Sequence, residues 1–178
     1  VTVGNMRLKD SLGIFNCSLA KIVESMKSEQ MKFTKAVFKQ NYHLFTKKLI
    51  FPYNKIKNTA SLNIKVSSLK KSDFNSNIGG YHECTDGEFA HFQKFVKTMG
   101  ITDIDGLIRA YNCSDSLFLA DSLQAVREKF FSVFKLDIIN FITLPQFSWT
   151  CFLRYSGVQI ERVMDPTMAM ELSNNIVG

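Results

Sequence analysis

The 178-residue sequence predicts a helix-rich α/β fold. Amphipathic runs that begin at recognisable capping residues fill most of the chain, and two short stretches alternate apolar and polar side chains as strands do. Hydrophobic residues make up 46% of the chain and aromatic residues 12%, so the chain carries enough apolar side chain for one folded core. A disordered chain of this length would have far fewer.

The first part of the chain predicts one strand and two helical stretches. Met6 to Lys9 alternates apolar and basic side chains, which is typical of a half-buried strand. Ser18 is a suitable N-cap for a helix over residues 19–26, and a second helical stretch runs over about residues 29–45. Phe51-Pro52-Tyr53 ends this helical region in a loop, because proline lacks the backbone donor that a continuing helix needs.

The middle of the chain predicts a connector and then the longest helix. Residues 54–82 are rich in Asn, Ser and Lys, include Gly79-Gly80, and read as irregular structure. Thr85-x-x-Glu88 matches a capping box and opens a helix with a phenylalanine stripe. Thr102 or Asp103 then starts the long helix.

The last part of the chain predicts two short helices with a strand between them. Pro145 interrupts the helical pattern, and a short helix runs through Trp149 and Leu153. Residues 158–163 alternate as a strand. Pro166 stands in the first turn of a final short helix.

Charge divides the chain into a basic and an acidic part. Residues 1–71 hold 14 Lys/Arg against 3 Asp/Glu, a balance of +11, and residues 72–178 hold 8 against 13, a balance of −5. This division suits a protein that grips a phosphate backbone with one part and presents carboxylates with the other. A lysine-rich solvated surface explains the same numbers, and charge alone does not separate the two interpretations.

The cysteines and the hydropathy pattern predict an intracellular protein without a membrane span. The chain has 4 cysteines, which are scattered and form no C-x-x-C pair, so we expect free thiols in a reducing compartment. We find no apolar run of about 18 residues and no secretory signal. The first residue is not Met, and we expect the chain to be a piece of a longer protein.

Two histidines are candidate zinc ligands. His82-Glu83-Cys84 and His91 lie near each other in the sequence, but a zinc site needs a second His or Cys pair at short spacing. The sequence offers none, so the structural interpretation is favoured for both histidines.

A tyrosine and a carboxylate at helical spacing are the most informative pair in the chain. Tyr111 and Asp115 stand at i and i+4 within the long helix, so both side chains share a face. Such a pair suits phosphodiester hydrolysis with two metal ions, in which an aspartate holds a divalent cation and a phenol orients the attacking water. A buried tyrosine beside a solvated aspartate is the competing interpretation.

The residues that follow this pair carry a family resemblance. After Tyr111-Asn112-Cys113-Ser114-Asp115 the chain continues with Leu117-Phe118-Leu119-Ala120-Asp121, Leu136-Asp137, Thr143-Leu144-Pro145, Trp149, Leu153, Gly157-Val158 and the terminal Ile176-Val177-Gly178. This order resembles the exonuclease-to-polymerase junction of protein-primed family B DNA polymerases, and is most similar to those of virus-like Polinton/Maverick elements and their viral relatives. There the pattern reads Y-x-x-x-D, L-A-D, L-D-P, T-x-P, W, L, G-V and I-R-G-G.

Two upstream segments match the same family in the right order. Asp10-Ser11-Leu12 resembles its D-S-hydrophobic segment, and Lys48-Leu49-Ile50-Phe51-Pro52-Tyr53 resembles its K-G-h-h-P-Y segment. Leu49 stands where the family has glycine. The matches span nearly the whole chain, and their shared order and spacing are more specific than any one of them.

The resemblance implies a fold and a function. Residues 1–135 would be the later part of a ribonuclease-H-like 3′–5′ exonuclease domain, and residues 136–178 a connector into a polymerase palm that this chain lacks. The longer protein would be a DNA-directed DNA polymerase with proofreading activity. It would use Mg²⁺ or Mn²⁺, a DNA primer-template, deoxynucleoside triphosphates and a terminal protein primer, with a nuclear or viral replication site left open as its location.

The resemblance also implies catalytic roles for three residues. Asp115 would be a metal ligand, Tyr111 would orient the attacking water, and Lys48 would lie near the scissile phosphate, where a cation stabilises developing charge. Lys47 could take the place of Lys48, and a plain surface lysine is the competing interpretation at either position.

Three further residues would contact the single-stranded primer end. Ser11 would hold a phosphate through its hydroxyl, while Leu12 and Phe15 would lie against bases. Two core residues beside an element end are the competing interpretation of the same segment.

Other metal-binding motifs of the family are absent from this chain. We find neither the D-x-E nor the N-x-x-x-D segment that supplies further exonuclease carboxylates, nor the D-T-D motif of the polymerase site. The alternative function is therefore a non-catalytic nucleic-acid-binding remnant of such an element.

Overall fold

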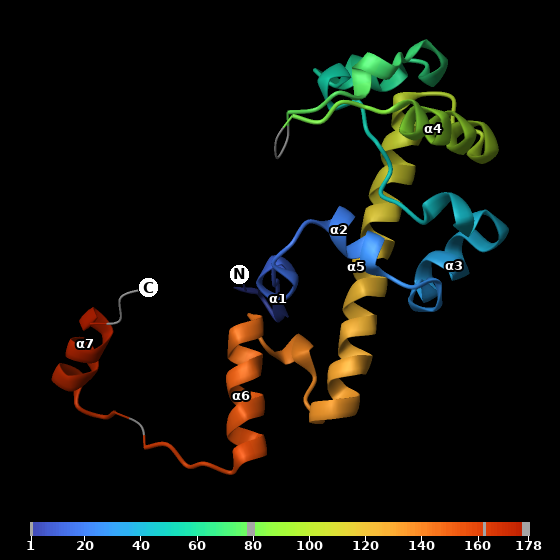
Figure 1. The fold of residues 1–178 in the computed structure, drawn as a ribbon. Helices are drawn as coiled ribbons and strands as arrows, with labels where there is room; N and C mark the ends of the chain where they lie inside the picture. Colours follow the sequence, from blue (N-terminus) through green and yellow to red (C-terminus); the bar gives the residue numbers. More distant parts are fainter. Residues whose placement is uncertain (1, 78–80, 162, 176–178) are drawn as a thin grey trace.

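One long helix organises the molecule. The computed structural model describes residues 2–77, 81–161 and 163–175. Helix α5, Ile104–Phe134, has 31 residues and forms a spine of about 46 Å along which most other elements lie. Figure 1 shows α4 and the 3₁₀ turns at one end of this spine, α2 and α3 beside its middle, and α6 near its other end.

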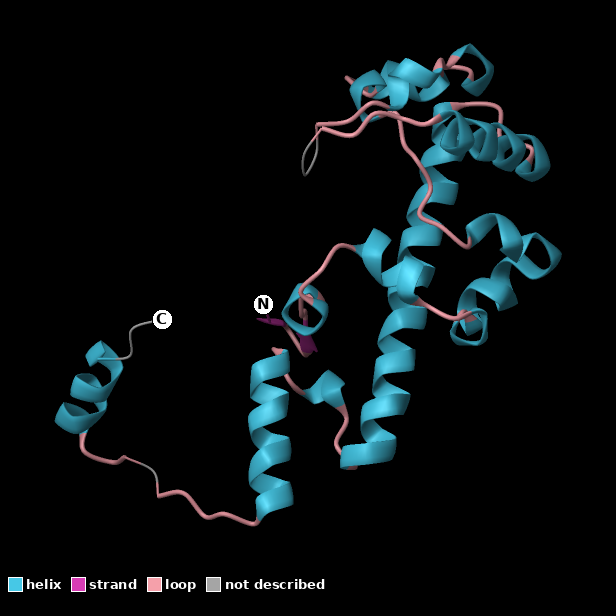
Figure 2. Cartoon of the chain, in the orientation of Figure 1, coloured by secondary structure: helices cyan, strands magenta, loops and turns pink. Residues whose placement is uncertain are grey.

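Helices and short turns make up most of the described chain (Figure 2). The other α-helices are α1 Leu12–Phe15, α2 Leu19–Ser25, α3 Lys32–Phe38, α4 Asp86–Met99, α6 Leu144–Ser156 and α7 Pro166–Asn175. The 3₁₀ turns are η1 Ser28–Gln30, η2 Lys39–Phe45, η3 Tyr53–Lys55, η4 Thr59–Asn63, η5 Val66–Ser68, η6 Lys71–Phe74 and η7 Ile138–Asn140. The irregular connector predicted over residues 54–82 is thus largely a chain of 3₁₀ turns.

The predicted helix-rich character is confirmed, whereas the strand content is much smaller than an α/β fold requires. Strands β1 Thr2–Val3 and β2 Met6–Arg7 form one antiparallel hairpin, with Gly4 at φ +57° in its turn. In the described ranges, isolated bridges such as Ser76 with His82 are the only other strand pairing. The predicted strand over residues 6–9 therefore forms, but it is two residues long and no helix-covered sheet accompanies it.

Polar caps set the start of four helices, and those at Ser18, Thr85 and Asp103 were predicted, whereas the cap at Thr143 was not. Ser18, Thr85, Asp103 and Thr143 each accept a hydrogen bond from a backbone N–H in the first turn of α2, α4, α5 and α6, respectively. The capping box between Thr85 and Glu88 is also confirmed. Short polar side chains at these positions satisfy N–H groups that have no partner within the helix.

The prediction of one continuous helical stretch over residues 29–45 is wrong. The chain forms η1, α3 and η2 instead, with a break at Met31 and a left-handed residue at Lys39, φ +46°. Asp121 of α5 explains the first break, because its buried carboxylate accepts hydrogen bonds from the backbone N–H groups of Phe33 and Thr34 at 2.7 and 3.0 Å. A distant side chain thus starts α3, and local periodicity could not predict this.

The strand predicted over residues 158–163 does not form. Residues 158–161 and 163 have no regular secondary structure, and no strand in the described part of the chain pairs with them. Pro145 also differs from its predicted role, because α5 already ends at Phe134 and the proline lies in the first turn of α6. Gly79-Gly80 and the terminal Ile176-Val177-Gly178 lie outside the described residues.

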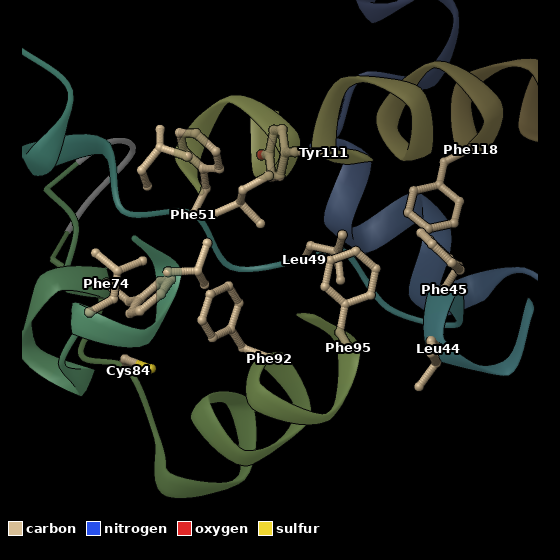
Figure 3. Close-up of a cluster of buried hydrophobic side chains, with 14 of the residues drawn as sticks. Leu44, Phe45, Leu49, Phe51, Phe74, Cys84, Phe92, Phe95, Tyr111 and Phe118 are labelled. Carbon is tan, nitrogen blue, oxygen red and sulfur yellow. The ribbon is translucent and has the colours of Figure 1, made fainter. Parts of the chain in front are cut away.

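The main hydrophobic core lies between α5 and the elements packed on its first half. Figure 3 shows aromatic side chains from the η2 region, α4 and α5 meeting in this core. Phe45, Phe95 and Phe118 are fully buried, and the Phe45 and Phe95 rings meet edge to face with centroids 5.3 Å apart. This packing fixes the segment after η2 against α5, which matters for the site described below.

A second, smaller core lies near the other end of α5. Ile14 of α1, Ile138 of η7, and Phe147 and Cys151 of α6 are its buried members. Helix α7 has no buried residue. No helix in the part of the chain that the structure describes combines the length and apolar character needed to cross a membrane.

The contact between α1 and the start of α6 gives a stability prediction at Gly13. A Cβ added to Gly13 would lie 2.8 Å from the carbonyl oxygen of Ile142, so the backbone would have to move. We expect Gly13→Ala to lower the free energy of unfolding by about 1–3 kcal/mol, measured by urea denaturation.

Gly87 provides the matched control for this change. It also lies in a helix, but a Cβ added there meets no atom within 4 Å. Gly87→Ala should therefore be neutral or slightly stabilising. Equal effects of the two substitutions would show that the α1–α6 contact is not close-packed.

Candidate functional site

The structure brings three of the predicted site residues together. The Nζ of Lys48 lies 3.4 Å from Oδ2 of Asp115, and it also lies over the Tyr111 ring, 5.6 Å from the ring centroid. Lys48 is 63 residues before Tyr111 in the sequence, so the contact depends on the fold. Tyr111 and Asp115 lie one turn apart on α5, as their spacing predicted.

Buried neighbours place Lys48 beside α5. Leu49 and Phe51 follow the lysine along the chain, and both pack into the main core (Figure 3). The Phe51 ring contacts the Tyr111 ring with centroids 4.8 Å apart. Because these apolar side chains are fixed, the backbone of Lys48 is held beside Tyr111 and Asp115. Leu49, which replaces the family glycine, serves here as one of these anchors.

The Asp115 carboxylate is half-buried, and only one of its two oxygens faces a polar partner. Burial raises the pKa of Asp115, while the charge and hydrogen bond of Lys48, and a weaker contribution from Tyr111, act in the opposite direction. Oδ2 faces Lys48, but Oδ1 is buried and has no hydrogen-bond partner among the described residues. A buried carboxylate oxygen without a partner is costly, and a cation or a donor beside it would remove that cost.

Tyr53 is a member of this site that the sequence analysis did not single out. Its hydroxyl lies 2.8 Å from the hydroxyl of Tyr111, close enough for a hydrogen bond in which either phenol is the donor. Burial, together with this hydrogen bond and the negative charge of Asp115, raises the pKa of Tyr111 well above its usual value. Tyr111 therefore keeps its proton at any physiological pH, and Tyr53 holds the phenol in one orientation. In the sequence, the one feature that pointed to Tyr53 was its place at the end of the segment Lys48–Tyr53, which matches the family.

A cavity of about 860 Å³ is lined by Lys48, Tyr53 and Tyr111, whereas Asp115 is not among its lining residues. The stretch from Thr46 to Tyr53 forms one wall, α4 forms another, and Tyr111 of α5 contributes to the lining. His82 and His91, the two candidate zinc ligands of the sequence, also line it, and His82 lies 3.3 Å from Glu88. The cavity is large enough for a nucleotide-sized ligand.

The described residues offer one good metal ligand and no complete metal site. Asp115 has the chemistry of a Mg²⁺ or Mn²⁺ ligand, because its free Oδ1 is a hard, anionic oxygen. Across residues 2–77, 81–161 and 163–175, no group of three or more His, Cys, Asp and Glu side chains could hold a metal ion. Any metal bound at Asp115 would need further ligands from elsewhere.

The three predicted primer-end contacts lie on a different element. Ser11 precedes α1, and Leu12 and Phe15 are its first and last residues. Helix α1 packs against α6, and none of the three residues lines the cavity. The Leu12 side chain is 55% exposed and therefore open to a ligand, whereas Ser11 and Phe15 are half-buried. The Ser11 hydroxyl does not cap α1, because the Asp10 carboxylate accepts the hydrogen bond from the backbone N–H of Leu12 at 2.9 Å.

Comparisons with known proteins return no relative of this chain. No protein-family model, no curated protein and no solved structure matches it.

Proposed function

We propose that this chain is the later part of the 3′–5′ proofreading exonuclease domain of a protein-primed family B DNA polymerase. The observation that carries the proposal is the convergence of Lys48 with Tyr111 and Asp115. The two sequence segments were matched to the family separately, yet the fold places their candidate catalytic side chains in contact. A chance match of either segment would not require this contact.

Each residue then has a role in phosphodiester hydrolysis. Asp115 would hold a divalent cation through Oδ1, the carboxylate oxygen left without a protein partner. Lys48 would move its ammonium group toward the scissile phosphate, where positive charge stabilises the transition state. Tyr111, held by Tyr53, would accept or donate a hydrogen bond at the attacking water. When bound, Mg²⁺ or Mn²⁺ would lower the pKa of that water and neutralise charge on the phosphate.

The remaining parts of the proposal concern a longer protein. Its ribonuclease-H-like sheet and further exonuclease carboxylates would lie upstream of these residues. Residues 136–178 would connect to the polymerase palm. Such a protein would use a DNA primer-template, deoxynucleoside triphosphates and a terminal protein primer, and would replicate a viral or virus-like mobile element.

An activity measurement on the isolated chain tests whether most metal ligands of the exonuclease lie outside these residues, as the proposal requires. We expect no efficient trimming of single-stranded DNA from its 3′ end with Mg²⁺ or Mn²⁺, because two-metal chemistry needs ions held by several carboxylates. Trimming at the rate of an intact proofreading domain would contradict the proposal.

The transcript sequence on both sides of the coding segment should contain the D-x-E and D-T-D motifs. Stop codons there would favour a non-catalytic remnant.

DNA binding by the isolated chain gives a further prediction. The basic residues 1–71, with a balance of +11, should supply most of the affinity, so binding should weaken steeply as salt rises. Phe15→Ala should reduce a preference for single strands, because unpaired bases can stack on an aromatic ring. Lys48→Ala should change binding less than cleavage. These changes are measured by titrating labelled single- and double-stranded oligonucleotides at two salt concentrations.

Two outcomes of that titration would count against a DNA-binding role. An affinity that does not change with salt would show that the lysines form only a solvated surface. Equal affinity for single and double strands would remove the case for a primer-end contact on α1.

A further inference from the structure

The cavity beside Lys48 is lined by a second lysine, which forms no ion pair in the described part of the chain. This second lysine is Lys47. Lys48, the next residue, is different because it faces Asp115. Both lysines line the cavity, but only Lys48 has an ion-pair partner among the described residues.

His91 is a second side chain of this cavity whose charge state depends on Lys47. It lies on α4, lines the cavity and is half-buried. Burial lowers the pKa of His91, and the charges of Lys47 and Lys94 lower it further, while a hydrogen bond to the backbone of Leu44 acts in the other direction. The imidazole is therefore mostly neutral at pH 7, because nearby cations and burial oppose its protonation.

Two acidic residues, Glu24 and Glu88, also line the cavity. Glu88 lies one turn before His91, but its carboxylate already accepts hydrogen bonds from the backbone N–H and the hydroxyl of Thr85, both at 2.8 Å, and contacts His82. Glu24 of α2 is exposed and forms no ion pair within the described residues. His43, the third histidine at this cavity, is exposed and contacts the backbone carbonyl of Gln40.

We propose that the part of the cavity lined by Lys47 and His91 binds a phosphate group, separately from the Lys48–Asp115 contact. A flexible lysine, an imidazole fixed on a helix and a half-enclosed cavity are the elements that hold phosphate in proteins. The aromatic side chain of Tyr53 lines the same cavity, is exposed and is available to a base. The ligand is thus a nucleotide phosphate, from a single-stranded DNA end or a free nucleoside monophosphate. That choice of ligand rests on the proposed function, whereas the phosphate site does not.

Anion binding and histidine protonation are coupled at this site. A phosphate beside His91 favours the charged imidazole, so binding raises the pKa of His91 from its lowered value. By the same linkage, the affinity for phosphate increases as pH falls through the pKa that His91 has in the complex. Lys47 contributes to the affinity, and the pH dependence comes from His91.

The experiment follows the imidazole C2–H signals of the 178-residue chain by NMR during pH titrations. The chain has 3 histidines, so the signals are resolvable. The signal that is lost in His91→Gln is the signal of His91. The probes are inorganic phosphate, thymidine 5′-monophosphate, oligothymidylate and thymidine without phosphate. Every phosphate-bearing probe that binds should raise the pKa of His91, and thymidine should not. Comparison of the monophosphate with the oligonucleotide identifies the source that the site prefers.

Variants of Lys47 separate this site from nonspecific attraction. Lys47→Gln should weaken thymidine 5′-monophosphate binding about fivefold, as expected for loss of one exposed charge-assisted contact. It should also raise the pKa of His91 in the free protein. Lys47→Arg should retain binding. Lys97→Gln is the matched control, because Lys97 is exposed on α4 but does not line the cavity.

Two results would overturn the proposal, and both are distinct from failure of the exonuclease assignment. A His91 signal whose titration is unchanged by saturating phosphate and nucleotide would exclude the site. Equal nucleotide affinities of wild type and Lys47→Gln would exclude the role of Lys47. Asp115→Asn should still bind phosphate at this site, so loss of excision in that variant would not bear on the inference.

Discussion

Asp115→Ala should reduce 3′–5′ excision by the longer gene product at least about 100-fold while largely sparing nucleotide addition. The substitution removes the carboxylate whose Oδ1 is free for a cation and whose Oδ2 faces Lys48. Nucleotide addition would use carboxylates at a separate site. The measurement compares release of the 3′ nucleotide from single-stranded DNA with primer extension on the same preparation.

Two companion variants make the Asp115 result specific. Tyr111→Phe should reduce excision less, by about tenfold, because it removes an orienting hydroxyl and no metal ligand. Asp105→Asn, on an exposed part of the same helix and paired with Arg109 at 2.9 Å, should leave excision unchanged. If Asp115→Ala excises like wild type, the assignment of this segment as the third exonuclease motif is wrong.

Asp121→Ala should produce the largest loss of stability, about 3–5 kcal/mol in the free energy of unfolding. The Asp121 side chain is fully buried and accepts hydrogen bonds from the backbone N–H groups of Phe33 and Thr34 and from the Thr34 hydroxyl. Alanine would leave these donors buried without a partner. Chemical denaturation followed by circular dichroism measures the loss.

An exposed carboxylate on the same helix is the control for Asp121. Asp105→Ala removes a surface ion pair with Arg109 and should cost about 0.5 kcal/mol or less. Asp121→Asn keeps the shape and one acceptor, so its cost should be intermediate. A cost for Asp121→Ala no larger than that for Asp105→Ala would show that α3 does not depend on this cap.

Local signals predicted the elements whose determinants lie close together in the sequence. The N-caps at Ser18, Thr85 and Asp103 each accept a hydrogen bond from a backbone N–H three residues later. The starts of α2, α4 and α5 could therefore be predicted from the sequence. The shared face of Tyr111 and Asp115 was readable for the same reason. The contact with Lys48 was expected from the resemblance alone, since nothing in local spacing brings residue 48 to α5.

Long-range contacts determined what the sequence did not predict. Asp121 starts α3 across a separation of 87 residues, which divides a stretch that reads locally as one helix. Tyr53 joins the site because Leu49 and Phe51 anchor its segment to the core beside Tyr111. The strand predicted over residues 158–163 failed for the converse reason, because an alternating pattern forms a strand only where another strand is available to pair with it.

The most direct test of the central claim is the excision activity of the longest reading frame that contains these 178 residues. The proposal predicts that the expressed protein releases mononucleotides from the 3′ end of single-stranded DNA with Mg²⁺ or Mn²⁺, and that Lys48→Gln slows release more than it weakens DNA binding. A folded, DNA-binding product that retains the upstream carboxylates but releases no nucleotides would contradict it.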